Sequence, residues 1–295
     1  MKVAKAMREK VIFIMGATGT GKSKLAIELA TRFSGEIINS DKIQVYQGLD
    51  VVTNKVTAEE QSLVQHHLLG VVDDPDKDFT AEDFRREVRR SIESIAGRGK
   101  VPIIAGGSNS YIEALVDEEF RSNYDSCFLW MDVTLSILHK IVSQRVDRML
   151  EEGLVEEVRK AFHPVGDYSR GIRRAIGVPE MHCYFREEEK LDEGKRASQL
   201  AKAIQAIKDN TRKLTCNQRK KILRLQEFLG WDINRLDSTE VFRKSGIEAE
   251  KAWKELINKP TVAMVNKFLV TAADGPAPTT ELETMATAEA FSVAG

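Results

Sequence analysis

A glycine-rich loop at residues 16–23, "GATGTGKS", holds the residue types that most directly indicate chemistry. The spacing Gly16-x-x-x-x-Gly21-Lys22-Ser23 lies between an apolar, β-branched run and an amphipathic stretch, the context that a phosphate-binding loop requires. Backbone N–H groups of such a loop and the amino end of the next helix bind phosphate oxygens. Lys22 would add a full charge, and the Ser23 hydroxyl would bind Mg²⁺. A plain strand-to-helix turn is the less favoured alternative.

The loop by itself leaves open whose phosphates it binds. A nucleotide kinase or NTPase would bind ATP there and would use an acidic residue at the end of an apolar strand to hold Mg²⁺. Asp132, which ends "FLWMD", matches that position and matches a turn or helix-capping residue equally well. A module that binds nucleotide without turnover is a third interpretation.

Short apolar strands, separated by helical stretches, must position these residues. Strands are expected at 11–15, at 35–41, from 101 to the Gly106–Gly107 pair and at 127–133, with helices after the glycine loop and over 80–96. This alternation predicts an α/β fold, a P-loop NTPase-like parallel sheet flanked by helices, with ligands beyond the carboxyl ends of the strands. Asp41 ends the second strand and would lie beside the glycine loop, where it could reach a bound substrate.

The chain changes character after the fourth strand. Strand signals stop at about residue 134, so we expect an α/β core over 1–133 and a mainly α-helical region over 134–270, part of which could pack back on the core. Residues 195–224 predict one long helix with ten basic residues and a single acid, Asp209. Residues 271–295 are rich in Ala, Thr and Pro and predict a disordered tail.

Composition narrows the class of protein. Lys and Arg number 44 against 45 Asp and Glu, so the net charge of −1 gives no general argument for nucleic acid or membrane partners. The apolar runs are too short to span a bilayer. Three distant cysteines predict neither a disulfide framework nor a zinc site, and the adjacent pair His66–His67 predicts a structural role. The ten residues before the first strand are too few for a targeting peptide, which predicts a cytoplasmic location, or a plastid one if such a segment has been removed.

Several further stretches accompany the glycine loop in a fixed order. Together the chain resembles the isopentenyltransferases over roughly residues 11–230, and it is more similar to the plant-type adenylate enzymes than to the tRNA dimethylallyltransferases. The stretches that carry the resemblance are "GATGTGKS", "NSDKIQVYQGLDVVTNK" (39–55), "HHLLG" (66–70), "GKVPIIAGGSNSYIEAL" (99–115), "GIRRAIGVPE" (171–180) and "TRKLTCNQRKKILRL" (211–225).

This resemblance implies that the loop binds the diphosphate of dimethylallyl diphosphate while the N6 amine of adenine attacks the allylic carbon. The bond that breaks is then C–O, and the loop holds a leaving group. Lys22, the loop amides and Mg²⁺ on Ser23 would neutralise the departing diphosphate. The amine proton becomes acidic as the N–C bond forms, so a carboxylate with an ordinary pKa near ~4 can accept it. We assign this general-base role to Asp41, worth typically ~10²–10⁴-fold.

The resemblance also implies binding residues by position. Ser108 of "GGSNS" and Arg212 of "TRK" would contact the diphosphate, together with Thr18 of the loop. Thr53 of "VVTNK" matches a threonine near the reacting centre and is grouped with the acceptor side. The loop residues expected at the diphosphate are Gly16, Thr18, Gly19, Thr20, Gly21, Lys22 and Ser23.

The choice of prenyl acceptor depends on charge and on the carboxyl end. A tRNA enzyme would present a broad basic surface and often a zinc-finger region, whereas this chain has no cysteine beyond Cys216. Free ATP or ADP is therefore favoured, with AMP weaker, and Arg174 and Lys220 are candidates for the acceptor phosphates. A tRNA acceptor is the alternative. A small-molecule P-loop kinase is more remote, and it would transfer phosphate without any prenyl donor.

Overall fold

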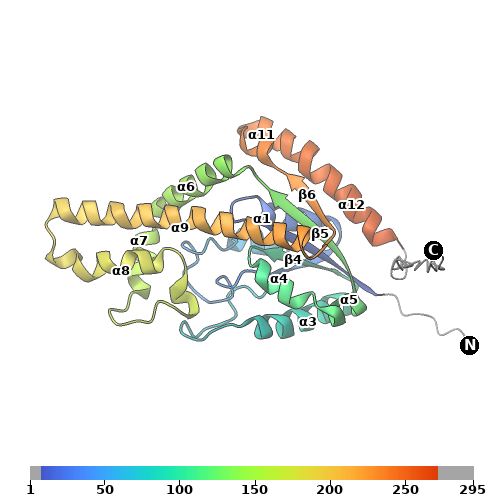
Figure 1. Ribbon diagram of the computed structural model, residues 1–295, viewed down its shortest axis with the longest axis horizontal. Coiled ribbons are helices and arrows are strands. Elements are labelled where there is room, and N and C mark those ends of the chain that lie inside the picture. The colour runs from blue at the N-terminus through green and yellow to red at the C-terminus, as the bar shows by residue number, and fades with distance from the viewer. Residues whose placement is uncertain (1–7, 272–295) are drawn as a thin grey trace, which may run out of the picture.

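A six-stranded parallel sheet forms the centre of the molecule (Figure 1). The computed structural model describes residues 8–271, so the tail predicted over 271–295 lies, apart from its first residue, outside the described residues. The strands, in the spatial order β3-β2-β4-β1-β5-β6, are β1 (Glu9–Gly16), β2 (Gly35–Asn39), β3 (His66–His67), β4 (Val101–Gly106), β5 (Tyr124–Asp132) and β6 (Ile233–Asp237). The α/β class predicted from the sequence is confirmed.

Helices cover both faces of this sheet and extend beyond it. The α-helices are α1 (Lys22–Arg32), α2 (Ala58–Leu63), α3 (Ala81–Gly97), α4 (Asn109–Leu115), α5 (Glu118–Asn123), α6 (Leu135–Glu151), α7 (Leu154–Ala161), α8 (Val178–Glu187), α9 (Glu193–Glu227), α10 (Thr239–Phe242), α11 (Gly246–Trp253) and α12 (Lys259–Val270). Two short 3₁₀ helices, η1 (Gly171–Arg174) and η2 (Glu188–Lys190), flank α8, and a π-helical turn, η3 (Lys254–Asn258), joins α11 to α12.

The side chains of the central strand, β1, contribute to both of the hydrophobic layers that lie on the two faces of the sheet. Residues 11–15 of β1 are fully buried, as expected for a strand covered on both faces. Side chains alternate along it, so Phe13 packs with α3, α4 and α9, whereas Ile12 and Ile14 pack with α1, α11 and α12. Figure 1 shows α3 and α5 on one side of the sheet and α11 and α12 on the other.

The strand registers bring the polar ends of several strands together. Met15 pairs with Gly106 of β4 and Gly16 pairs with Met131 of β5, while Asn39 of β2 pairs with Ala105. The carboxyl ends of β1, β2, β4 and β5 therefore meet at one edge of the sheet. The glycine loop, Asp41 and Ser108 all follow this edge.

The expectation that strands stop at about residue 134 is wrong. β6 forms at residues 233–237 and pairs in parallel with β5 at the edge of the sheet. Its five residues, "INRLD", carry three polar side chains, and only Ile233 and Leu236, three residues apart, are buried, so the apolar signal lacks the alternation of a strand. The pairing with β5 supplies the stabilisation that the local sequence lacks. Helices α10 to α12 also return to the core.

The long basic helix is confirmed and is longer than expected, with 35 residues in α9. It packs against α6 and α8 over much of its length and against α4 and β1 near the sheet (Figure 1). One hydrophobic cluster includes side chains from the sheet, from α8 and from α9. The boundary at residue 134 between core and helical region stays a prediction.

The main chain at the end of β4 lies very close to the main chain just after β2, and this closeness leads to a prediction. A Cβ atom on Gly106 would lie 2.3 Å from the main-chain oxygen of Ser40, the residue before Asp41. Gly106→Ala should therefore lower the free energy of unfolding by about 1–3 kcal/mol, measured by urea denaturation. Gly97→Ala is the matched control, since a Cβ there would meet nothing within 4 Å. Equal stability of the two variants would contradict this reading of the strand ends.

Candidate active site

The glycine loop joins β1 to α1 in a conformation that depends on glycine. Gly19 and Gly21 have φ angles of 86° and 91°, in the left-handed region that other residues avoid. A Cβ on Gly19 would also lie 2.9 Å from Val142 of α6. Because α1 begins at Lys22, the free N–H groups and positive end of this helix belong to the loop. The arrangement is that of an anion-binding turn.

A cavity of about 280 Å³ opens beside the loop. It brings together the loop, the residues after β2 and β4, and side chains from α6 and α9. The residues that line it include Thr18, Gly19, Gly21, Lys22, Ser23, Asn39, Asp41, Gln44, Asn54, Gly106, Gly107, Ile141, Arg145, Arg148 and Gln218. The structure thus places five of the predicted loop residues and Asp41 around one space.

Positive charge dominates the floor of this cavity. Burial lowers the pKa of Lys22 to about 8; Asp41 opposes this shift and Arg145 adds to it. The Lys22 ammonium donates to the main-chain oxygen of Ala17 at 2.7 Å. Burial likewise lowers the pKa of Arg145 to about 10, with the charge of Arg148 adding to the effect and Asp41 opposing it. Cations held out of water in this way favour a bound anion.

Arg145 was not predicted from the sequence. Its Nη2 donates to the Thr18 hydroxyl at 2.7 Å, and among the described residues its buried Nε has no hydrogen-bond partner. A signal was present, because Arg145 follows Leu138 and Val142 at helical spacing on the buried face of α6. A charge on such a face needs a specific reason to be buried.

Gln218 of α9 was also missed. Its side-chain oxygen accepts the Thr18 N–H at 2.9 Å, and its side-chain amide donates to the Gly107 carbonyl at 3.0 Å. The Asn109 side chain in turn donates to the Gln218 main-chain oxygen at 3.1 Å. Gln218 therefore ties the glycine loop to the turn after β4, across 200 residues of sequence.

Asp41 is held by its own turn and faces the cavity. Its Oδ1 accepts the N–H groups of Ile43 at 2.9 Å and Gln44 at 3.3 Å. Within residues 8–271, the other carboxylate oxygen accepts no hydrogen bond. One oxygen thus orients the group, and the second is available to a substrate.

Three predicted hydroxyl groups are engaged within the protein. Thr20 donates to the Ala17 carbonyl at 2.9 Å and is buried, so its backbone N–H is what it can offer to a phosphate. Ser108 accepts the N–H of Lys42 at 2.9 Å. Thr53 donates to the Leu49 carbonyl at 2.6 Å. None of these three side chains lines the loop cavity.

Arg212 also lies outside the lining of the loop cavity. Its guanidinium donates to the Ser143 hydroxyl at 3.0 Å and to Asp209 at 2.9 Å. Contact with a diphosphate would require it to leave these partners. The sequence could not show this competition, because Ser143 belongs to a different helix.

A second group of cations lies next to Asp41. Burial lowers the pKa of Lys42, and the charges of Arg174 and Lys221 lower it further. Arg174 is 3.7 Å from Asp78, and in the described part of the chain its buried Nε has no hydrogen-bond partner. Lys220, the predicted lysine, and its neighbour Lys221 are both exposed, and it is the charge of Lys221 that acts on the pKa of Lys42. The structure therefore adds Lys42 and Lys221 to the predicted acceptor side.

Ser23 is in a position to offer an oxygen to Mg²⁺. Its hydroxyl lines the cavity, is exposed, and forms no hydrogen bond with another described residue. An oxygen donor suits this hard cation. Both Asp132 oxygens are instead paired, with Arg219 at 3.2 Å and Arg235 at 2.8 Å. Among residues 8–271, no group of three or more His, Cys, Asp or Glu side chains is arranged to hold a metal ion, so Mg²⁺ would rely on Ser23 and on substrate oxygens.

The predicted structural role of the histidine pair agrees with its contacts. His67 Nε2 lies 2.7 Å from Glu36, a buried carboxylate that Arg98 and Lys100 also bind. His66 Nδ1 lies 2.8 Å from the Val64 carbonyl.

In the part of the chain that the structure describes, no helix is both long and apolar enough to cross a membrane.

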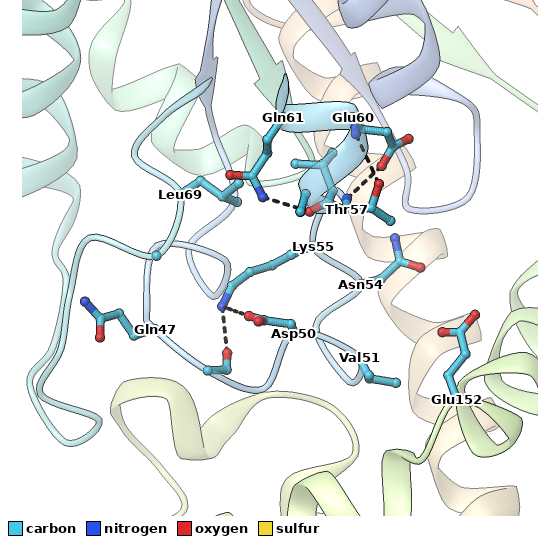
Figure 2. Close-up of a pocket in the computed structure, with 14 residues that line it drawn as sticks. Gln47, Asp50, Val51, Asn54, Lys55, Thr57, Glu60, Gln61, Leu69 and Glu152 are labelled. Carbon is cyan, nitrogen blue, oxygen red and sulfur yellow. Dashed lines mark hydrogen bonds and ion pairs between the residues drawn. The ribbon is translucent and has the colours of Figure 1, made fainter. Parts of the chain in front are cut away.

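A larger cavity of about 700 Å³ lies beside the segment that follows Asp41 (Figure 2). Lys55 spans its floor and donates to Asp50 and to the Gly48 carbonyl, both at 2.6 Å. The lining also contains Glu60 and Glu152, so acids outnumber the single lysine. This excess of negative charge disfavours phosphate. Asn54 lines both cavities and marks where they adjoin.

A parallel sheet with a glycine loop, and a carboxylate at the neighbouring strand end, define a P-loop NTPase-like α/β enzyme. The model of the IPP transferase family matches residues 44–122 and 115–222, and the chain belongs to this family. The chain is 56% identical over 266 residues to adenylate isopentenyltransferase 5, chloroplastic, of Arabidopsis thaliana, covering 89% of this chain and 81% of that protein. It is 40% identical over 294 residues to an adenylate isopentenyltransferase of Humulus lupulus, covering 87% and 89%.

Solved structures share the fold. A eukaryotic dimethylallyltransferase acting on tRNA matches with a TM-score of 0.74 and 24% identity, over 88% of this chain and 79% of that one. A tRNA isopentenylpyrophosphate transferase of Bacillus halodurans matches with a TM-score of 0.67 and 24% identity, over 89% and 99%. The overall fold of this chain therefore recurs in these tRNA-modifying enzymes.

The lowered pKa of Lys22 predicts pH-dependent anion binding. With a pKa of about 8, the charged fraction of Lys22 falls as the pH rises from about 7 to about 9. The Kd for inorganic diphosphate should therefore rise by about 10-fold over this range, measured by calorimetry. Lys22→Gln is the control, because it keeps the titration of diphosphate itself and removes that of the lysine. Identical pH profiles would show that Lys22 does not carry the effect.

Proposed function

We propose that this enzyme transfers a dimethylallyl group from dimethylallyl diphosphate to N6 of the adenine of ATP or ADP and releases diphosphate. The observation that carries the proposal is the single cavity that joins the glycine loop to Asp41. The adenylate isopentenyltransferases at 40–56% identity favour an adenine nucleotide as acceptor. The tRNA enzymes, at 24% identity, support the shared fold and leave tRNA as the alternative acceptor.

The cavity supplies each part of the reaction. The loop N–H groups, Lys22 and Arg145 bind the diphosphate and stabilise the negative charge that develops on it as the allylic C–O bond breaks. The N6 lone pair forms the new C–N bond, and the free oxygen of Asp41 accepts the N6 proton. When Mg²⁺ is bound at Ser23, it supplies further neutralisation of the leaving group.

The acceptor side is electropositive next to Asp41. Lys42, Arg174 and Lys221 lie close enough for their charges to act on one another, and burial sharpens the effect. Nucleotide phosphates would neutralise them, whereas adenosine would not. The larger cavity carries excess acid and is a poor alternative for these phosphates. For the location, the names of the relatives at 53–56% identity, two chloroplastic and one mitochondrial, favour an organelle, such as the plastid, over the cytoplasm.

One assay distinguishes the candidate functions. The protein is incubated with Mg²⁺, dimethylallyl diphosphate and, in separate reactions, ATP, ADP, AMP, adenosine or an adenosine-containing anticodon stem-loop, and the products are identified by mass spectrometry. We expect prenylated ATP and ADP, with diphosphate released only when both substrates are present. Phosphate transfer without the prenyl donor would instead identify a kinase. Product on the stem-loop alone would identify a tRNA enzyme.

Removal of the base should slow the chemical step. Asp41→Asn keeps the side-chain shape, and we expect kcat to fall by roughly 10²-fold or more with nucleotide still bound. Asp50→Asn is the matched control, because Asp50 belongs to the same segment but pairs with Lys55 at the other cavity. Near-normal turnover of Asp41→Asn would remove Asp41 from the mechanism.

The KM for the acceptor should depend on how many phosphates the acceptor carries. Each charge-assisted contact contributes ~1.5–3 kcal/mol, so KM should rise from ATP and ADP to AMP and further to adenosine. Arg174→Ala should raise KM for ATP by about 10-fold or more and change KM for adenosine little. We expect Lys221→Ala to act in the same way and more strongly than Lys220→Ala. An equal rise in KM for ATP and for adenosine would instead show that Arg174 stabilises the fold and does not bind the acceptor phosphates.

A further inference from the structure

We propose that Trp253 is a positioning residue that sets the conformation of the glycine loop, and with it the affinity for the prenyl diphosphate. The inference rests on the proposed function of the loop as a diphosphate site. Trp253 ends α11 and is only 4% exposed. It lies beyond residue 222, where the match to the IPP transferase family model ends.

The indole lies directly against the loop backbone. A Cβ atom on Gly21 would be 2.9 Å from Cζ3 and 3.2 Å from Cη2 of Trp253. Gly21 precedes Lys22, and its left-handed φ of 91° sets the direction of the next N–H groups. The indole ring therefore fills the space where a side chain at position 21 would lie.

The indole is itself anchored to the helix that follows the loop. Its Nε1 donates to both carboxylate oxygens of Glu28 on α1, each at 2.9 Å. Asn258 donates to the same carboxylate at 2.6 Å. The π-helical turn at 254–258 places Trp253 and Asn258, five residues apart, on the same side to reach Glu28.

Trp253 also contacts the first turn of α1, through Lys24. The Lys24 ammonium lies 4.8 Å from the Trp253 ring centre and pairs with Glu250 at 2.8 Å. Lys24 follows Ser23 directly. Trp253 thus contacts the residue before Lys22 and the residue after Ser23, so it fixes both ends of the dipeptide that would bind diphosphate and Mg²⁺.

The test compares substitutions at Trp253 with one at a tryptophan away from the loop. Trp253→Ala should raise both the Kd for inorganic diphosphate and the KM for dimethylallyl diphosphate by about 10-fold or more, with the KM for ATP within about twofold, because the loop loses its outer support. Trp253→Phe keeps an aromatic ring on α11 but lacks Cζ3, Cη2 and the Nε1 donor, so its Kd for inorganic diphosphate should lie between those of the wild type and of Trp253→Ala. Trp231→Ala is the control, since Trp231 packs on Phe128 in the other hydrophobic layer.

The outcomes separate this inference from the proposed function. Diphosphate affinity in Trp253→Ala equal to wild type, or a parallel loss in Trp231→Ala, would overturn the positioning role. If Trp253→Ala does not fold, Glu28→Gln keeps the packing, weakens the anchor, and should still raise the KM for the prenyl donor selectively. Wild-type protein that bound no diphosphate at all would overturn the proposed function itself.

Discussion

The structure depends on two cations, Lys22 and Arg145, that are held largely out of water beside one carboxylate. Burial lowers the pKa of both, and Asp41 is the nearby charge that opposes this shift. Such an arrangement is costly without an anion, because desolvation disfavours each charge. It becomes favourable when a diphosphate occupies the cavity. In the proposed reaction, the same electrostatic feature would serve both affinity for the prenyl donor and stabilisation of the leaving group.

The rest of the fold keeps these groups at the sheet edge. The registers of β1, β2, β4 and β5 bring their carboxyl ends together, and the contact of Gly106 with Ser40 fixes the approach of Asp41. Gln218 closes the loop from the α9 side, while Trp253 supports it from the α11 side. The loop is therefore held between segments that lie about 200 residues and more further along the chain.

The two strand-end aspartates differ in how many of their carboxylate oxygens are bound within the protein. Asp132 has both oxygens bound by Arg219 and Arg235, so it stabilises the junction of β5, β6 and α9. Asp41 uses one oxygen for its own turn and leaves the other toward the cavity. A strand-end aspartate thus serves structure at position 132, whereas at position 41 it keeps one oxygen available for the base role that we propose.

The sequence by itself determined the glycine loop, four of the strands, the long α9 helix and the family, because these features rest on local spacing and on motifs in order. It also singled out Asp41, which the structure places in the same cavity as the loop. The tertiary structure alone decided that β6 joins the sheet, that Arg145 and Gln218 line the cavity, and that Arg212 and Thr53 are engaged elsewhere. The physical reason is that a local pattern encodes backbone conformation and which face is apolar, whereas the partner of a buried polar side chain depends on which distant segments pack together.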